Sequence, residues 1–288
     1  MNGFDFSFKP FAVAAAVVWG LMAASPLRAA NDVWKTAASG TWGAGGSWVD
    51  GSPPSSIFDQ ATFDKAGAYT VSFNADPDPI GALTLTSATN VTFASSSRPG
   101  NPILPRSLRL IEASGVSTGD LRISGGATLT LGAVTGGFPS TSHPFHLTAD
   151  SNLHINPGAT LNVRFGSDVV TLILSSDGLI NVSGSGSTLN AHTTQVGDGS
   201  LNVTAGGLVQ SSNSIVGLAG TGTATVSGAG SQWNNLGRLT VGFDEGASGT
   251  LNVTGGGSVS SADGVIGVIN GTGTATVTGG AWTMTGQL

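Results

Sequence analysis

A short unit rich in Gly and Thr recurs along the second half of the chain, and this repetition constrains the fold more than any other feature. The segment Gly-Thr-Gly-Thr-Ala-Thr-Val at 220–226 returns at 271–277, and Leu-Asn-Val-Thr at 201–204 returns at 251–254. The two kinds of unit interleave, with spacings of 23, 27 and 24 residues between the equivalent valines Val203, Val226, Val253 and Val277. A repeat of about 25 residues is typical of a solenoid, in which each coil buries its apolar residues against the next.

Within each unit, apolar residues alternate with polar ones. Leu251 and Val253, for example, have polar neighbours on both sides. Alternation with period two predicts half-buried β-strands, and the Gly clusters between them predict turns. We therefore expect three short strands in each coil, which in one coil are residues 239–242, 250–254 and 258–260.

These patterns predict an all-β fold, a right-handed parallel β-helix with coils stacked about 4.8 Å apart. Stacking would place Leu251 between Ala224 and Ala275 of the neighbouring coils. A looser repeat lies upstream, where residues 121–131 match residues 153–163. Residues 108–288 have room for about seven coils, and the most regular part is 196–288.

The first thirty residues have the composition of an export signal. An apolar stretch at 11–24 follows Lys9 and precedes small residues that end at Ala29 and Ala30. Its fourteen residues would form a helix of about 21 Å, too short for a hydrocarbon core of roughly 30 Å. We therefore expect a signal peptide at 1–30, and no transmembrane helix once it is removed.

The segment 31–94 differs from the repeats, because Trp34, Trp42 and Trp48 cluster there. An open solenoid end exposes apolar core and strand edges, so this segment is predicted to be an N-terminal Trp-rich β cap. Residues 95–107 are rich in Ser and Pro and are predicted to be a seam or loop before the repeats at 108–288. The last coil has no comparable cap, so we expect either that the sequence is a fragment of a longer chain or that there is end-to-end or capped assembly at that coil.

The composition excludes several classes of function. Charged residues make up 9% of the chain, against roughly 25% in an average soluble protein, and only 10 residues are Lys or Arg. Those are too few for a basic patch, so we expect no nucleic-acid partner. The chain has no Cys, which excludes disulfides, thiolate nucleophiles and Cys zinc sites.

One alternative is a β-helical polysaccharide lyase or hydrolase, which would need clustered carboxylates. The best candidates are Asp244, Glu245 and Asp263, with Asp244 and Asp263 expected near neighbouring turns. His143 and His146 have the i,i+3 spacing of metal ligands, but no third ligand accompanies them. We therefore predict no catalytic residue, no cofactor and no metal site.

The most ordered surface feature is a set of outward columns of Thr and Asn. Alignment of Val226, Val253 and Val277 brings equivalent polar residues of three coils together. This candidate contact face consists of Thr223, Thr225, Thr250, Asn252, Thr254, Thr274, Thr276 and Thr278. Such ladders stabilise parallel stacks, and a flat polar array also suits a polysaccharide surface. A soluble carbohydrate-binding module that uses this face is a second alternative, with cell-surface or extracellular polysaccharide as partner.

The units at 249–259 (Gly-Thr-Leu-Asn-Val-Thr-Gly-Gly-Gly-Ser-Val) and 222–233 (Gly-Thr-Ala-Thr-Val-Ser-Gly-Ala-Gly-Ser-Gln-Trp) resemble the secreted β-solenoid repeats of bacterial autotransporter passengers and PEP-CTERM-associated repeat proteins. The Trp-rich start, with Trp42, Trp48 and Asp-Gln-Ala-Thr-Phe at 59–63, is similar to the opening of such chains. The resemblance implies an exported, non-catalytic structural or adhesin-like passenger or stalk. It would be extracellular or at the cell surface, and associated with the outer membrane if part of a longer passenger.

Overall fold

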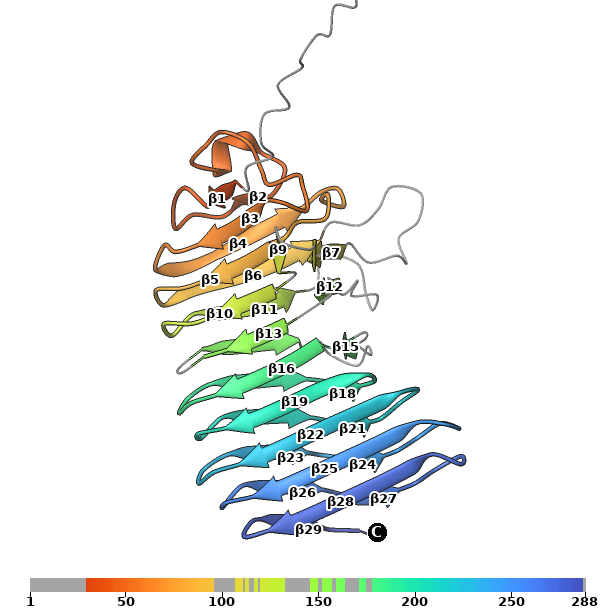
Figure 1. The fold of residues 1–288 in the computed structure, drawn as a ribbon. Helices are drawn as coiled ribbons and strands as arrows, with labels where there is room; N and C mark the ends of the chain where they lie inside the picture. The colour runs from red at the N-terminus through yellow and green to blue at the C-terminus, as the bar shows by residue number, and fades with distance from the viewer. Residues whose placement is uncertain are drawn as a thin grey trace, which may run out of the picture.

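The computed structural model describes residues 30–95, 107–110, 112–113, 117–118, 120–132, 146–149, 152–156, 159–163, 171–174 and 178–286. Within these ranges the elements are short β-strands and one 3-10 turn, η1 (Gly45–Ser47). Strands of successive turns stack in parallel, from β1 at one end to β29 at the other (Figure 1). The predicted all-β parallel solenoid is therefore confirmed. The predicted signal peptide, apart from Ala30, and residues 96–106 of the predicted seam lie outside the described residues.

Two ten-stranded parallel sheets run the length of the solenoid. The first sheet contains β1 (Asn31–Val33), β3 (Gln60–Phe63), β5 (Ala82–Leu85), β10 (Asp120–Ile123), β13 (Asn152–Ile155), β16 (Gly178–Ser183), β19 (Gly199–Thr204), β22 (Thr221–Ser227), β25 (Ser248–Thr254) and β28 (Thr272–Thr278). The second sheet contains β2 (Gly40–Thr41), β4 (Gly67–Phe73), β6 (Thr89–Ser95), β11 (Thr128–Gly132), β14 (Thr160–Val163), β17 (Thr188–Ala191), β20 (Leu208–Ser211), β23 (Gln232–Asn235), β26 (Ser258–Ser261) and β29 (Ala281–Met284).

A third sheet closes the later turns. It contains β15 (Thr171–Leu174), β18 (Thr193–Val196), β21 (Asn213–Val216), β24 (Arg238–Val241) and β27 (Asp263–Ile266). Two small pairs lie nearer the N-terminus. They are the parallel pair β7 (Ser107–Leu110) with β12 (His146–Ala149), and the antiparallel pair β8 (Glu112–Ala113) with β9 (Ser117–Thr118).

The strand register follows the sequence repeat. Val203 lies opposite Val226, Val226 opposite Val253, and Val253 opposite Val277. Leu251 lies between Ala224 and Ala275, as the alternation predicts. The looser upstream match is also correct, because Leu121 pairs with Leu153 and Leu129 with Leu161.

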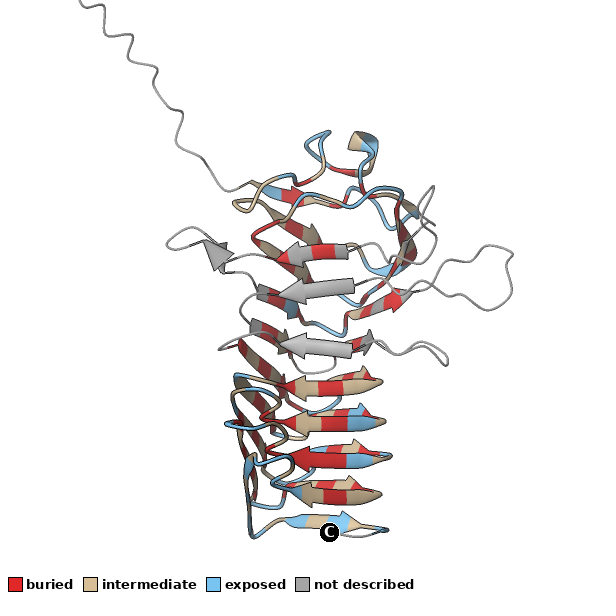
Figure 2. Cartoon of the chain, turned by 90° about the vertical axis from the view of Figure 1, so that its right-hand side faces the viewer, coloured by how far each residue is buried: buried red, intermediate tan, exposed pale blue. Residues whose placement is uncertain are grey.

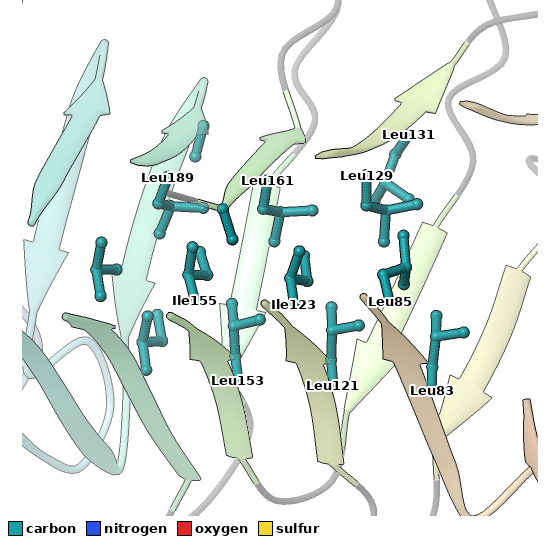
Figure 3. Packing of buried hydrophobic residues seen from close by; sticks show 14 of the residues in the cluster. Leu83, Leu85, Leu121, Ile123, Leu129, Leu131, Leu153, Ile155, Leu161 and Leu189 are labelled. Carbon is teal, nitrogen blue, oxygen red and sulfur yellow. The ribbon is translucent and has the colours of Figure 1, made fainter. Parts of the chain in front are cut away.

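Inward side chains form columns along the stack, and Figure 3 shows them meeting between the first and second sheets. The first sheet contributes Leu83, Leu121 and Leu153 from successive strands, and the second contributes Leu129, Leu161 and Leu189. Each of these six side chains is at most 2% exposed. Because a four-residue strand buries only two side chains, the core depends on stacking of rungs rather than on any single strand.

The predicted Trp-rich cap is confirmed as an aromatic cluster. The rings of Trp34 and Trp48 meet edge to face, with centroids 5.1 Å apart, and Trp42 lies 5.0 Å from Trp48. The Trp48 indole Nε1 donates a hydrogen bond to the Trp42 carbonyl at 2.7 Å. The cap strands β1 to β6 belong to the same two sheets as the repeats, so the cap consists of solenoid rungs filled with aromatic side chains.

The outer edge of β1 is covered by the segment that follows η1. The Val49 amide donates to the Val33 carbonyl at 2.9 Å, and the Lys35 amide donates to the Ser47 carbonyl at 2.8 Å. Trp34 and Trp48 form an antiparallel bridge between these hydrogen bonds. An antiparallel segment thus occupies hydrogen-bonding groups that a further parallel strand would need.

Glycine is required at two kinds of corner. A Cβ on Gly249, where the third sheet turns into the first, would collide with the backbone of Gly242 and Val216. At the corner between the first and second sheets, Gly255 and Gly256 have φ of 57° and 88° in a turn closed by the Gly257 amide on the Thr254 carbonyl. Two successive positive φ angles favour Gly, which explains the Gly-Gly-Gly of this repeat.

The last four rungs alternate between two kinds of interior. We call β19–β21 and β25–β27 the Leu rungs, and β22–β24 and β28–β29 the Trp rungs. The first-sheet column reads Leu201, Ala224, Leu251, Ala275, and the second-sheet column reads Val209, Trp233, Val259, Trp282. The third-sheet column reads Ser214, Leu239, Gly264. Each large side chain therefore stands in a rung that has a small one elsewhere, which keeps the interior filled.

The indoles of the Trp rungs lean toward the preceding Leu rung. Trp233 Nε1 donates to Ser211 Oγ, and Trp282 Nε1 donates to Ser261 Oγ, each at 3.1 Å. A Cβ on Gly264 would lie 2.8 Å from Cζ2 of Trp282, so the small residue of the Leu rung makes room for the ring. The alternation is thus a three-dimensional fit between neighbouring rungs.

Replacement of an inward residue by a charged one should unfold the C-terminal rungs. Val253 is 0% exposed, so Val253→Asp buries a carboxylate without a partner and should lower the free energy of unfolding by more than about 3 kcal/mol. Asn252→Asp, one residue away on the outward side, is the matched control and should unfold close to wild type. Urea denaturation measures both; equal stability of the two variants would contradict the register.

The volume alternation predicts a coupling between two distant positions of one rung. Ala224→Leu overpacks the rung and should cost about 1–3 kcal/mol, while Trp233→Val leaves a cavity and should cost about 3 kcal/mol. The double variant gives the first and second sheets of this rung the residues of a Leu rung and leaves Leu239 in the third sheet, so its cost should be smaller than the sum of the two. Additive costs in a double-mutant cycle would show that the two sites do not share space.

Candidate functional site

The candidate contact face has the register that the sequence predicts. Its columns are Thr223–Thr250–Thr274 and Thr225–Asn252–Thr276, followed by Ser227–Thr254–Thr278. These side chains are half-buried in β22 and β25 and exposed in β28, as outward residues of a sheet should be. Since neighbouring parallel strands lie about 4.8 Å apart, hydroxyl and amide groups recur at that spacing along the rod.

The middle column of this face continues far beyond the three rungs found from sequence. It runs on through Asn202, Asn181, His154, Arg122, Thr84 and Thr62 of the earlier strands. Sequence reasoning missed this extension because the rungs there have unequal lengths. Leu83 and its register partner Leu121 are 38 positions apart in the sequence, whereas Val253 and its partner Val277 are 24 positions apart.

The second sheet carries another column of polar residues in register, which sequence reasoning missed. Its register positions are Thr92, Thr130, Asn162, Asn190, Gln210, Asn234, Ser260 and Thr283. Ser260 Oγ donates to Asn234 Oδ1 at 3.2 Å across two rungs. The match between residues 121–131 and 153–163 aligns Thr130 with Asn162. That alignment is the sequence signal from which this column could have been found.

The chemistry of the predicted face is that of neutral hydrogen bonding. Strands β22, β25 and β28 contain no charged residue, and their outward side chains are hydroxyls and one amide. Hydroxyls and amides both donate and accept hydrogen bonds. Such a face can match a flat polymer that presents hydroxyl groups at a regular spacing, whereas a strongly ionic ligand would find no counter-charge on these three strands.

The carboxylates of the enzyme alternative do not come together. Asp244 and Glu245 lie in the turn after β24, at the corner between the third and first sheets. Asp263 is the first residue of β27 and pairs with Arg238 at the opposite end of that strand pair. The expectation that Asp244 and Asp263 lie near each other is therefore wrong. Asp263 lies beside the start of β24 and Asp244 follows its end, and a four-residue strand spans roughly 10 Å.

The histidine spacing is largely outside the described residues. His143 lies outside them, and of His146 only the backbone position in β12 is described. In the part of the chain that the structure describes, no group of three His, Cys, Asp or Glu side chains is placed to hold a metal ion.

A cavity of about 490 Å³ lies beside the cap. Its walls include Trp42, Pro53, Pro54, Phe73, Asp76 and Asp78. The loops around 53–55 and 74–78 come together there because β2 and β4 are neighbours in the second sheet. Trp42 and Phe73 are only 3% and 1% exposed, so their rings serve the core rather than offering a free face to a ligand.

The N-terminal rung contains one buried carboxyl group. Asp32 occupies an inward position opposite Ala61 and is 4% exposed. Burial, and then the charges of Asp59 and Asp50, raise its pKa from 3.8 to about 6. Asp59 itself is held by the amides of Ser55 at 3.0 Å and of Ala30 at 3.4 Å. The sequence shows an acid-rich segment here, but not that one of its acids points inward.

Comparisons with known proteins give no relative from which a function could be inferred. No family model matches this sequence, and the searches of curated proteins and of solved structures give no match. Among the described residues, no helix has the length and apolar character needed to cross a membrane.

Asp32 should make stability depend on pH. Its folded-state pKa is above the ordinary value, so between about pH 4 and pH 6 the folded protein binds more protons than the unfolded protein. The free energy of unfolding should therefore fall as pH rises through this window. Asp32→Asn should raise the melting temperature at pH 7 and flatten the dependence, while Asp78→Asn, at an exposed position and not among the charges that raise the pKa of Asp32, should change both much less. An unchanged pH profile in Asp32→Asn would contradict this account.

Proposed function

We propose that this chain is an exported, non-catalytic structural rod that acts as an adhesin-like passenger or stalk at a bacterial cell surface. The observation that carries the proposal is the uncharged polar face, which keeps one register through β22, β25 and β28. The resemblance of the repeats to secreted β-solenoid repeats and the signal-like composition of residues 1–30 support export.

The energetics of the stack suit a load-bearing element. Each rung is held by parallel backbone pairing on two or three sheets and by inward columns that are almost fully buried. Stability of such an array is close to a sum of similar terms between neighbours, so length is gained without a new core. A face that repeats similar polar groups on β22, β25 and β28 presents several equivalent contact points, which favours contact with a polymer over capture of one small molecule.

The partner that this surface chemistry favours is a neutral polysaccharide. Hydroxyl groups of a sugar chain can exchange hydrogen bonds with the Thr and Asn columns, and the absence of charge on the three strands avoids the desolvation of ions. The carbohydrate-binding alternative uses the same face and differs only in whether the rod is anchored. The lyase or hydrolase alternative has less support, because Asp244 and Asp263 lie at opposite ends of the strand pair β24–β27.

Lysine substitutions on the face should remove polysaccharide binding without unfolding the rod. The test variant is Thr250→Lys with Thr274→Lys, two outward neighbours in the first sheet. The control is Ser260→Lys with Thr283→Lys, two outward neighbours in the second sheet. In cosedimentation with cellulose and with insoluble bacterial matrix polysaccharide, binding by the test variant should fall at least about tenfold, equivalent to 1.4 kcal/mol, while the control binds like wild type.

Circular dichroism should show the same β content for both variants and a similar small loss of melting temperature, because each variant places two like charges on neighbouring strands. Equal binding by the test variant and wild type would place the contact elsewhere. A combined alanine variant at Asp244, Glu245 and Asp263 separates the classes further. A structural protein keeps its binding in that variant, whereas release of soluble sugar by wild type and its loss in the variant would establish the enzyme alternative.

A further inference from the structure

A backbone amide just before β1 faces a carboxylate of the cap. The Ala30 amide donates a hydrogen bond to Asp59 Oδ1 at 3.4 Å. The Gln60 amide in turn donates to the Ala30 carbonyl at 2.8 Å, so backbone pairing with β3 starts at Ala30. Figure 2 shows this region at the N-terminal end of the stack, where β1 passes from an exposed residue to a buried one and then to a half-buried one.

The Asp59 carboxylate is held in place by the turn that contains it. Its Oδ2 accepts a hydrogen bond from the Ser55 amide at 3.0 Å. The Asp59 amide donates to the Ser56 carbonyl at 2.9 Å, and the Asp59 carbonyl accepts from the Gly81 amide at 2.8 Å. A group that is already ordered loses little freedom when it binds a partner, so this carboxylate is prepared to bind a cation next to Ala30.

Within the described residues, no Lys, Arg or His side chain forms an ion pair with Asp59. The ion pair found there joins Lys65 to Asp64. Residues 30–95 carry more acids than bases, namely Asp32, Asp50, Asp59, Asp64, Asp76 and Asp78 against Lys35 and Lys65. The charge of Asp59 is also one of the causes, after burial, that raise the pKa of Asp32. A cation at Asp59 would therefore relieve an excess of negative charge at this end of the rod.

The sequence places the end of the expected export signal at the same point. Export peptidases cut after small residues, and a cut after Ala29 leaves the uncharged Leu27 at the third position before it. A cut after Ala30 would instead put Arg28 at that position. It would also remove the carbonyl that accepts the Gln60 amide. The cleavage pattern and the start of backbone pairing therefore agree on the bond between Ala29 and Ala30.

We propose that an export peptidase hydrolyses the bond between Ala29 and Ala30, and that the α-ammonium group so formed binds the Asp59 carboxylate and fastens β1 onto β3. This inference rests on the proposed export of the chain. In the cut, the hydroxyl of a water molecule adds to the Ala29 carbonyl carbon, the carbon–nitrogen bond breaks, and the nitrogen of Ala30 takes the other proton. The new carboxylic acid then gives its proton to the new amine, which leaves a carboxylate on Ala29 and an ammonium on Ala30.

The cut replaces a neutral donor by a charged one at the same place. The Ala30 nitrogen keeps its position because the Ala30 carbonyl remains bound to the Gln60 amide. Hydrogen bonds from an ammonium to a carboxylate are roughly twice as strong as bonds between neutral groups. Neutralising Asp59 also weakens one of the charges that disfavour ionised Asp32. Processing thus strengthens the first rung in the exported chain, whereas a chain that retains its signal has only an amide at this place.

The first test reads the position of the cut. The full chain is produced in a Gram-negative host, and the protein from the periplasm and the medium is analysed by N-terminal sequencing and intact mass. The expected first residues are Ala-Asn-Asp-Val, residues 30–33. Export with a different first residue would overturn this inference alone. An uncut chain that stays in the cytoplasm would contradict the proposed export as well.

The second test compares a chain that starts at Ala30 with one that starts at Ala29, which keeps an amide at Ala30 and moves the ammonium one residue away. The chain that starts at Ala30 should melt at a higher temperature, and amide exchange in residues 31–33 should be at least about threefold slower. Asp59→Asn keeps the shape of the side chain but not its charge, so it should abolish both differences. Asp78→Asn, which removes an exposed acid elsewhere in the cap, should retain them. Equal melting and exchange of the two unsubstituted chains would overturn the proposal.

The pKa of the α-amine separates an ion pair from a general effect on folding. With ¹³C-methyl groups on the Ala30 nitrogen, an NMR titration measures this pKa directly. A carboxylate beside the ammonium raises the pKa above its ordinary value. The pKa should be at least about 0.5 higher than in Asp59→Asn, which is about threefold in proton affinity. Asp32 and Asp50, the other acids of this cluster, are present in both chains. Equal pKa values in the two chains would show that the ammonium does not bind Asp59.

Discussion

Everything in this structure depends on keeping the interior of each rung filled while successive rungs stay in parallel register. A rung buries only a few side chains, so a void or a clash in one rung is transmitted to both neighbours. The alternation of Leu251 and Val259 with Ala224 and Trp233 satisfies this constraint by exchanging volume between sheets within a rung. The buried hydroxyl of Ser211 then gives the Trp233 indole a hydrogen-bond acceptor, so a polar group of one rung fixes the ring of the next.

The rungs at the two ends of the described stack are filled in different ways. At the N-terminal end, large aromatic rings fill the rung interiors, and the segment around Trp48 blocks the edge of β1 by antiparallel pairing. Asp32 adds a buried acid to this end, and its pKa is raised because burial disfavours the charged carboxylate. At the C-terminal end the last described rung has the interior of a middle rung, because Ala275 and Trp282 repeat the pattern of Ala224 and Trp233.

Much of this fold was predictable from sequence where the rungs have nearly equal length. Between Leu201 and Val277 the period places strands, inward residues and outward columns correctly, because the turns there use the same Gly-rich corner. Upstream, insertions between strands change the spacing, so the membership of residues 31–94 in the same two sheets left no periodic signal. The inward position of Asp32 was not predictable either, since alternation alone favours an apolar residue there. Likewise, the separation of Asp244 from Asp263 depends on which corner each turn occupies, and the spacing along the chain does not show that.

The division between inward and outward positions also bears on function. Because stacking satisfies the core with residues at alternate positions, the outward residues of β22, β25 and β28 contribute little to apolar burial. If these positions served only to face solvent, single charged residues would be tolerated there. Like charges on neighbouring strands about 4.8 Å apart would still be disfavoured, because they repel each other. Neutral Thr and Asn columns avoid that repulsion and pack against one another along the stack. A stable ladder therefore needs uncharged outward residues, and a neutral polymer needs a regular hydrogen-bonding surface. The same residues meet both requirements. This coincidence is why a variant with unchanged stability but altered binding is the informative one on this face.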